Sequence, residues 1–203
     1  MTKMAHPDHP ILDVIAERWS PYGYGDRPVE KKDLASLFEA ARWAASSYNE
    51  QPWRYIVATR DDPGEFKRLL SCLVEPNQAW AQSAPVLALG IASLSFARND
   101  KPNSVAVHDL GQASAMLSIE ATARGLSVHQ MSGILPDRAR ELYGVPEGYE
   151  VVTALAIGYA AHPDTQTDDF READTTPRER RPLAEFVFAG SWGESAGIGR
   201  KDD

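Results

Sequence analysis

Apolar residues recur at helical spacing in several separate segments of the chain. Between residues 30 and 45 they fall at i, i+3, i+4 and i+7, which defines one apolar face of a helix. That face consists of Leu34, Leu37, Phe38 and Ala41. Apolar positions predict further helices over residues 10–19, 64–73, 104–124 and 135–144. The first of these ends at Ser20-Pro21, because a proline ring disfavours helical backbone in the residue before it.

Four other segments have the patterns of β-strands. Residues 53–60 (WRYIVATR) alternate in character, as a half-buried strand does. Residues 85–93 (PVLALGIAS) are almost continuously apolar, which is typical of a strand covered on both faces. Residues 126–131 and 149–160 complete the set, and a loop is expected around Glu75-Pro76-Asn77. Helices and strands mix without strict alternation, so the pattern predicts an α+β fold.

The segment 104–124 is the clearest predicted helix. Its stripe consists of Val107, Leu110, Ser114, Leu117 and Ala121, and the small residues Gly111, Ala113 and Ala115 lie beside it. Small residues let a second helix approach closely, so this helix is a candidate for a subunit interface. An ordinary core helix explains the spacing equally well.

The chain becomes polar after Pro163 and has little to bury there. We expect an extended arm, followed by a small element at residues 183–188. The 203 residues fit a single domain over 1–203, with 1–9 and about 195–203 expected to be flexible.

Charge and cysteine content narrow the classes of function. The net charge of −8 argues against a large nucleic-acid footprint, yet leaves room for a small basic pocket that binds a phosphate. The single cysteine, Cys72, allows no internal disulfide and no cysteine-based metal cage. No stretch reaches the roughly 18 apolar residues of a membrane span, and the N-terminus has no signal-peptide pattern. A cytoplasmic protein without membrane contact is the expectation.

Isolated motifs do not identify an activity. Gly23 and Gly25 follow a helix rather than a strand, and no third glycine completes a dinucleotide fingerprint. His108 and Asp109 are adjacent on a predicted helix and therefore point about 100° apart. His129 has no second ligand at metal spacing, so we interpret it as structural or as lining a pocket.

Several segments in a fixed order are more informative. They are RWS at 18–20, ASSYNEQPW at 45–53, HQMSG at 129–133, IGY at 157–159 and RERRPL at 178–183. This set resembles the nitroreductase-like flavoprotein family from about Asp13 to Phe188. The block SSYNEQPW is specific, whereas the first segment alone would carry little weight.

The resemblance implies a fold, a cofactor and an assembly. The fold is a central, mostly antiparallel sheet flanked by helices, with a C-terminal arm that extends onto a partner subunit. The cofactor is FMN, with NADH or NADPH as reductant, and the assembly is a homodimer with a flavin at each end of its interface. The implied activity is ping-pong hydride transfer through flavin N5 to a flat acceptor such as a nitroaromatic or quinone. No catalytic side chain and no metal are implied.

The resemblance also assigns residues to the flavin. Arg18, Ser20, Arg178 and Arg180 match phosphate-side and ribityl-side positions, and guanidinium groups suit phosphate through bidentate geometry. Trp19 and Tyr22 belong to the same segment. Ala45, Ser46 and Asn49 match positions that face the flavin of the opposite subunit. Asn77 matches a contact to the pyrimidine edge, and Met131, Ser132 and Gly133 match a segment whose backbone lies against N5. Which of Arg178, Arg180 and Arg181 contacts the phosphate stays open.

Two positions depart from the family pattern. Tyr22 and Trp80 stand where some members carry lysines close to flavin N1 and O2. Without those charges the reduced anionic flavin should be harder to form, unless Arg18 or backbone donors substitute. The two aromatic residues could form a wall for a flat substrate, although Trp80 could equally be part of the core.

Three alternative functions stay open at this stage. The same fold could carry other flavin chemistry, such as dehydrogenation, dehalogenation or flavin cleavage. It could bind flavin without catalysis. The chain could also be a small interaction protein with no cofactor.

Overall fold

A four-stranded sheet forms the centre of the computed structural model, which describes residues 3–199. The strands are β1 (Trp53–Thr59), β2 (Val86–Ser93), β3 (Ser127–Met131) and β4 (Tyr149–Gly158), in the order β1-β2-β4-β3. All three neighbouring pairs are antiparallel. The predicted α+β class and antiparallel sheet are therefore confirmed.

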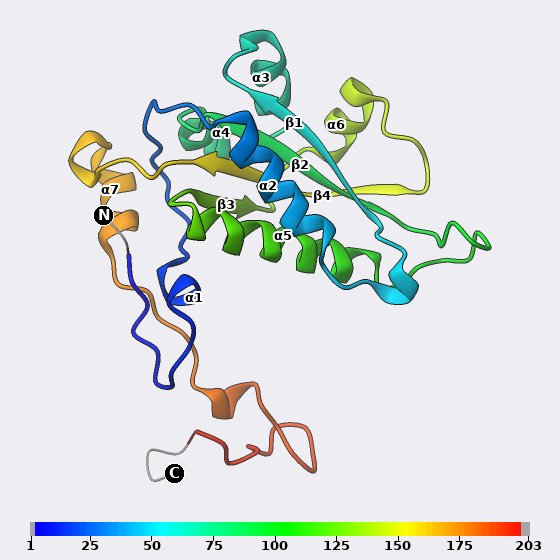
Figure 1. Cartoon of the computed structure of the whole chain (residues 1–203), viewed down its shortest axis with the longest axis vertical. Helices are drawn as coiled ribbons and strands as arrows, with labels where there is room; N and C mark the ends of the chain where they lie inside the picture. The colour runs from blue at the N-terminus through cyan, green and yellow to red at the C-terminus, as the bar shows by residue number, and fades with distance from the viewer. Residues whose placement is uncertain (1–2, 200–203) are drawn as a thin grey trace.

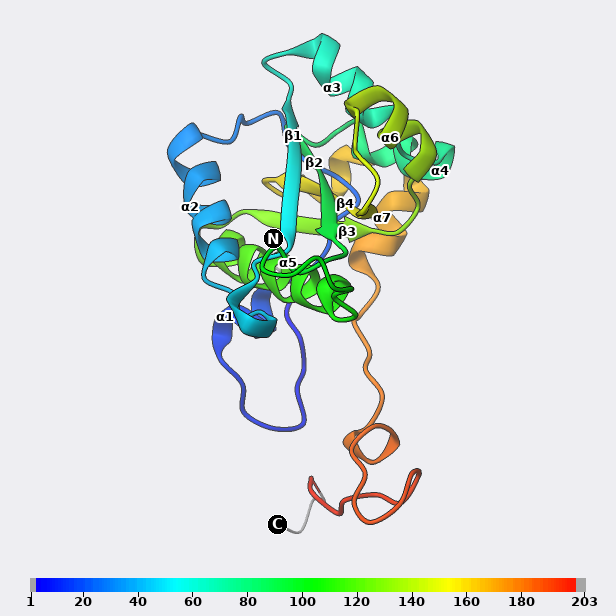
Figure 2. The ribbon, with the colours of Figure 1, turned by 90° about the vertical axis from the view of Figure 1, so that its right-hand side faces the viewer.

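Two hydrophobic layers cover the sheet, one on each face (Figures 1 and 2). On one face lie α2 (Lys31–Arg42) and α5 (Ala106–Ala123), whose Leu37, Leu110 and Leu117 are fully buried. On the other lie α3 (Pro63–Leu70), α4 (Glu75–Ala81) and α6 (Pro136–Tyr143). Because β2 is central and covered on both faces, seven of its eight residues are buried.

The remaining elements are short and surround the core. They are α1 (Asp13–Glu17), α7 (Asp168–Thr175) and the 3-10 turns η1 (Ser47–Asn49), η2 (Pro163–Thr165) and η3 (Leu183–Glu185). Beyond α7 the chain runs away from the sheet, as its orange and red end shows in Figures 1 and 2. The ends of the predicted flexible segments, residues 1–2 and 200–203, lie outside the described residues. Within residues 3–199, no helix combines the length and apolar character needed to cross a bilayer.

Three local predictions were wrong. The expected loop at Glu75–Asn77 is the start of α4, because Pro76 occupies the first turn, where its missing N–H is not needed. The polar segment after Pro163 was expected to bury little, yet it forms α7 and buries Asp174. Val107, placed on the buried stripe of α5, is 42% exposed, because the buried face is centred on Leu110, Ser114 and Leu117.

Candidate functional site

Three arginines from distant parts of the sequence gather beside α1. Arg18 follows α1, whereas Arg178 and Arg180 follow α7. Arg178 donates hydrogen bonds to the backbone oxygens of Arg18 and, at 2.6 Å, of Ala16. Arg18 donates from Nη1 to Ser20 Oγ at 3.2 Å. The C-terminal segment therefore fixes the position of the RWS segment through direct contacts.

The charge of this cluster is not neutralised by the chain. Across residues 3–199, no carboxylate forms an ion pair with Arg18, Arg178 or Arg180. Burial lowers the pKa of Arg18 below its usual value, and the charge of Arg180 lowers it further. Burial and the two neighbouring arginines lower the pKa of Arg178 in the same way. Arg181 differs, since its Nε lies 4.0 Å from Glu185 Oε2.

An unused donor in the cluster also favours an anion. Arg178 Nε is buried and has no hydrogen-bond partner within the described chain. Buried donors are usually satisfied, and a phosphate oxygen is a suitable acceptor for a guanidinium. The donor chemistry here, with Ser20 beside Arg18, fits a phosphate ester such as that of FMN.

Aromatic side chains extend the site from the arginine cluster toward the sheet. Tyr22 stacks on Phe170 with a centroid distance of 5.8 Å and meets Trp80 and His129 edge-on at 5.3 and 4.9 Å. Trp80 and His129 stack at 4.3 Å. Trp80 is only 3% exposed, so it belongs to the core rather than to an open substrate wall. Trp19 is buried as well.

His129 holds the backbone of this region rather than a ligand. Its Nδ1 lies 2.9 Å from Pro21 O, and since a carbonyl only accepts, Nδ1 carries the proton. Burial lowers the pKa of His129, and the hydrogen bond to Pro21 partly opposes this. The imidazole is thus neutral near neutral pH and serves as a donor to the backbone.

Gly133 follows Met131 and Ser132, and any side chain at this position would overlap its neighbours unless they move. Its oxygen accepts from Asn77 Nδ2 and from Val74 N, both at 3.0 Å. A Cβ at Gly133 would lie 2.3 Å from Asn77 Nδ2 and 2.9 Å from Val74 Cγ2. The Gly133 N–H donates no hydrogen bond among the described residues. Glycine thus permits close packing on one side and keeps a backbone donor available.

Asn77 and its neighbours link the aromatic residues to Gly133. The Asn77 amide accepts from Trp80 Nε1 at 3.3 Å while it donates to Gly133, so both of its ends have protein partners. Met131 is buried at the end of β3, and Ser132 is exposed beside Gly133. One chain therefore brings together ten of the thirteen predicted residues: Arg18, Trp19, Ser20, Tyr22, Asn77, Met131, Ser132, Gly133, Arg178 and Arg180.

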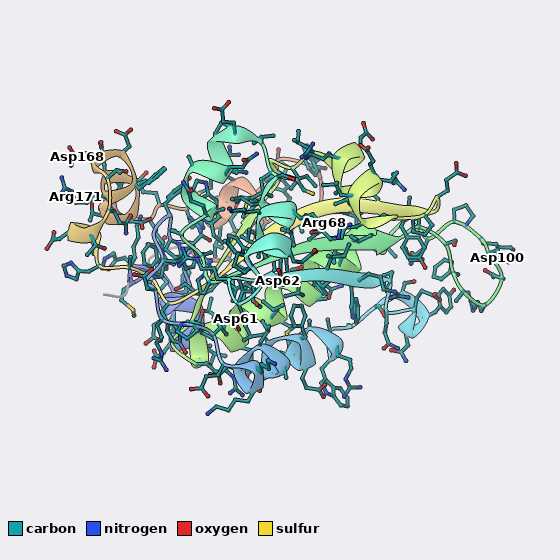
Figure 3. All side chains as sticks on the ribbon, turned by 90° about the horizontal axis from the view of Figure 1, so that it is seen from above. Asp61, Asp62, Arg68, Asp100, Asp168 and Arg171 are labelled. Carbon is teal, nitrogen blue, oxygen red and sulfur yellow. The ribbon has the colours of Figure 1, made fainter. Side chains whose placement is uncertain are left out.

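The other three, Ala45, Ser46 and Asn49, lie elsewhere. They follow α2 in and around η1, which Figure 1 places at the opposite end of α5 from the segment after α1. Glu50 in this turn accepts from Ala97 N of the loop between β2 and α5, at 2.8 Å. Figure 3 shows the tip of that loop, at Asp100, at the far end of the molecule from Arg171 on α7. No single chain can therefore bring both groups to one ligand.

The turn around η1 has an unusual backbone. Tyr48, Asn49 and Gln51 have φ values of 53°, 56° and 53°, a region that residues other than glycine rarely adopt. Ser46 Oγ accepts from Gln51 N at 3.0 Å, and Asp109 Oδ2 of α5 accepts from Ser47 N at 3.0 Å. Ala45 and Asn49 are exposed. The turn is held from inside and presents these residues outward.

Sequence reasoning missed the contribution of α7. Asp174 accepts hydrogen bonds from the backbone N–H groups of Tyr22 and Gly23, and Phe170 covers Tyr22. The only signal in the sequence is an aromatic residue four positions before an aspartate in an otherwise acidic, polar segment.

Comparison with known proteins identifies the family of this chain. The model of the Nitroreductase family matches residues 15–159. A crystal structure described as an oxidoreductase containing FMN superposes with a TM-score of 0.88 and 31% identity, covering 94% of this chain and 97% of that one. An uncharacterized 15.4 kDa protein of Mycolicibacterium smegmatis is 32% identical over 69% of this chain and 97% of its own. The major NAD(P)H-flavin oxidoreductase of Aliivibrio fischeri is 27% identical over 88% of this chain and 98% of its own. This chain therefore belongs to the nitroreductase family.

Proposed function

We propose that this chain is an FMN-dependent NAD(P)H oxidoreductase that works as a homodimer. The observation that carries the proposal is the unneutralised cluster of Arg18, Arg178 and Arg180, which continues through Tyr22 to the backbone of Gly133. The arginine cluster suits a phosphate, and the backbone of Gly133, which a ligand can approach closely, suits a flat ring. Together they fit a ligand that carries both groups. Similar proteins include an oxidoreductase containing FMN and an NAD(P)H-flavin oxidoreductase, which supports the same cofactors here.

The three arginines differ in how many N–H groups they have available for the phosphate. Arg178 donates one hydrogen bond from each terminal nitrogen to a backbone oxygen, while its buried Nε has no partner among the described residues and is a donor for an anion. Arg18 and Arg180 make fewer contacts within the chain and supply the main phosphate contacts in this proposal. Ser20 adds a short hydroxyl donor. At neutral pH the phosphate carries close to two negative charges, which would relieve the repulsion among the three guanidiniums.

The ring is held by backbone from one subunit and by side chains from its partner. The free N–H of Gly133 is the donor proposed for N5, and Asn77 keeps that backbone in place. Ala45, Ser46 and Asn49 come from the partner, because within one chain they lie at the other end of α5. Exposed apolar residues on α5 and on the arm, such as Met116, Phe186 and Trp192, support a dimer in which the arm covers the partner.

The protein's own residues bind and orient but do not exchange protons with a substrate. When bound, FMN would supply the redox chemistry: it would accept a hydride from NADH or NADPH and pass it to a flat acceptor such as a nitroaromatic or quinone. Hydride transfer needs contact geometry, so the residues that surround the bound ring are expected to select the acceptor. The partly buried Tyr22 and the buried Trp80 bring no charge, so Arg18 or backbone donors such as the Gly133 N–H are needed to compensate the charge of the reduced flavin.

An absorbance scan followed by anaerobic titration tests the proposal. We expect a yellow protein whose flavin bands bleach on addition of NADH or NADPH and return on addition of a quinone. A colourless protein that binds no added FMN would refute the assignment. A flavin that neither nucleotide reduces would indicate flavin binding without this activity. Sedimentation of the same sample is expected to give a dimer, and a monomer that retains FMN would contradict the two-subunit site.

A further inference from the structure

Asp174 is a buried carboxylate whose hydrogen-bond donors are all uncharged groups. It is 4% exposed and forms no ion pair with any residue from 3 to 199. Instead it accepts hydrogen bonds from Tyr22 N at 2.9 Å, Gly23 N at 3.3 Å and Gln166 Nε2 at 2.9 Å. Burying a charge is costly unless such donors compensate it. The three hydrogen-bond donors therefore compensate the loss of water around the carboxylate.

These hydrogen bonds act on the backbone that carries Arg18 and Ser20. Tyr22 lies two residues after Ser20, and Pro21 between them is fully buried. Pro21 O accepts from His129, while Arg18 O accepts from Arg178. Residues 18–23 are thus anchored by β3, by the segment after α7 and by α7 itself.

Phe170 of α7 and Gln166, which lies just before α7, contact the same segment. Phe170 stacks on the Tyr22 ring with an interplanar angle of 4°. The Gln166 side chain fills the space over Gly23, where a Cβ would lie 2.4 Å from Gln166 Cδ. α7 begins at Asp168 and lies outside residues 15–159, which the family model matches.

We propose that Asp174 is a positioning residue for the phosphate-binding segment. By holding the N–H groups of Tyr22 and Gly23, it keeps Arg18 and Ser20 in the geometry that binds the FMN phosphate. It does not touch the cofactor. This inference rests on the proposed function and adds that the affinity for FMN depends on α7.

The test compares flavin-free Asp174→Asn with wild type, using FMN titration by quenching of flavin fluorescence. An asparagine must turn an N–H toward one of three donors, so we expect FMN affinity to fall about 10-fold. The matched control is Glu172→Gln, an exposed residue on the same helix that loses the same charge. It is expected to bind FMN like wild type. If Asp174→Asn does not fold, Gln166→Ala removes one donor and is expected to weaken FMN about 3-fold.

Combination with Arg18→Ala separates positioning from general destabilisation. If Asp174 acts through Arg18, the loss caused by Asp174→Asn shrinks when Arg18 is already absent. The inference is overturned if Asp174→Asn lowers FMN affinity by the same factor in the Arg18→Ala protein as in wild type. It is also overturned if Asp174→Asn and Gln166→Ala both bind FMN like wild type. A wild-type chain that binds no FMN contradicts the proposed function itself, which separates the two failures.

Discussion

The two ends of α5 carry two polar groups of different construction. At one end, the segment that carries Arg18 and Ser20 lies beside the aromatic cluster around Tyr22 and is fixed by contacts from α7, from Arg178 and from His129 of β3. At the other end, Ser46 and Asn49 lie in an exposed turn that is held mainly by its own hydrogen bonds.

The difference shows which half of the site one chain can complete. The first group is held by several contacts within the chain, so its residues are expected to determine cofactor affinity. In the second group Asn49 has left-handed backbone and is exposed, as is Ala45, so this group is expected to act on a partner. Strained backbone of this kind persists where the surroundings enforce it, and it is common at functional sites.

The largest effect is expected from removing a phosphate partner. Arg18→Ala should weaken FMN binding about 10- to 100-fold, because a hydrogen bond between charged groups is lost, with the fold intact. Fluorescence titration gives the affinity, and circular dichroism checks the fold. Arg171→Ala is the control, since Figure 3 shows this residue pointing away from the core on α7. Equal affinity in Arg18→Ala, together with Ser20→Ala, would show that the phosphate is bound elsewhere.

Gly133→Ala should disturb the proposed flavin site by changing its packing. The new Cβ would overlap Asn77 Nδ2 and Val74 Cγ2, so we expect the free energy of unfolding to fall by about 1–3 kcal/mol. Urea denaturation measures it, and FMN affinity should fall as well. Gly64→Ala on α3 is a suitable control, because its nearest contact would be an ordinary 3.4 Å. A stable Gly133→Ala protein with unchanged affinity would remove this glycine from the site.

Asn49→Gly tests the other end and should change two properties in opposite directions. Glycine accepts the φ of 56° readily, so stability should rise by about 0.5 kcal/mol. Loss of the amide should weaken FMN binding in the dimer about 5-fold. Asp100→Gly has the same φ of 56° but lies at the loop tip, so it should gain stability alone. Unchanged affinity in Asn49→Gly would exclude a role for this side chain at the partner's flavin.

The smallest effect is expected from the titration of His129. Burial places its folded pKa below the ordinary value of 6.5, so the unfolded chain takes up a proton that the folded chain resists. Its contribution to stability is therefore present above pH 6.5 and is lost as the pH falls toward the folded pKa. Urea denaturation between pH 5 and 8 measures the slope. His129→Asn, which keeps a donor for Pro21, should flatten that slope, and an unchanged slope would mean that other groups cause it.

The sequence by itself determined the sheet, the main helices and the residues proposed for the site. Strands such as β2 and helices such as α2 follow from local periodicity, which depends only on neighbouring residues. The ordered motifs pointed to Arg18, Ser46 and Gly133 as candidates, because a family pattern fixes residue type at fixed spacing. Those signals depend on neighbouring residues, so they can be recognised before the fold is known.

Only the tertiary structure decided what depends on contacts between distant segments. It buried Trp80, formed α7 from a polar segment and brought Asp174 to the backbone of Tyr22, 152 positions away in sequence. A single aspartate in an acidic stretch has no pattern that reveals its partner. It is buried because backbone donors from another segment replace water, and that compensation exists only once the chain has folded.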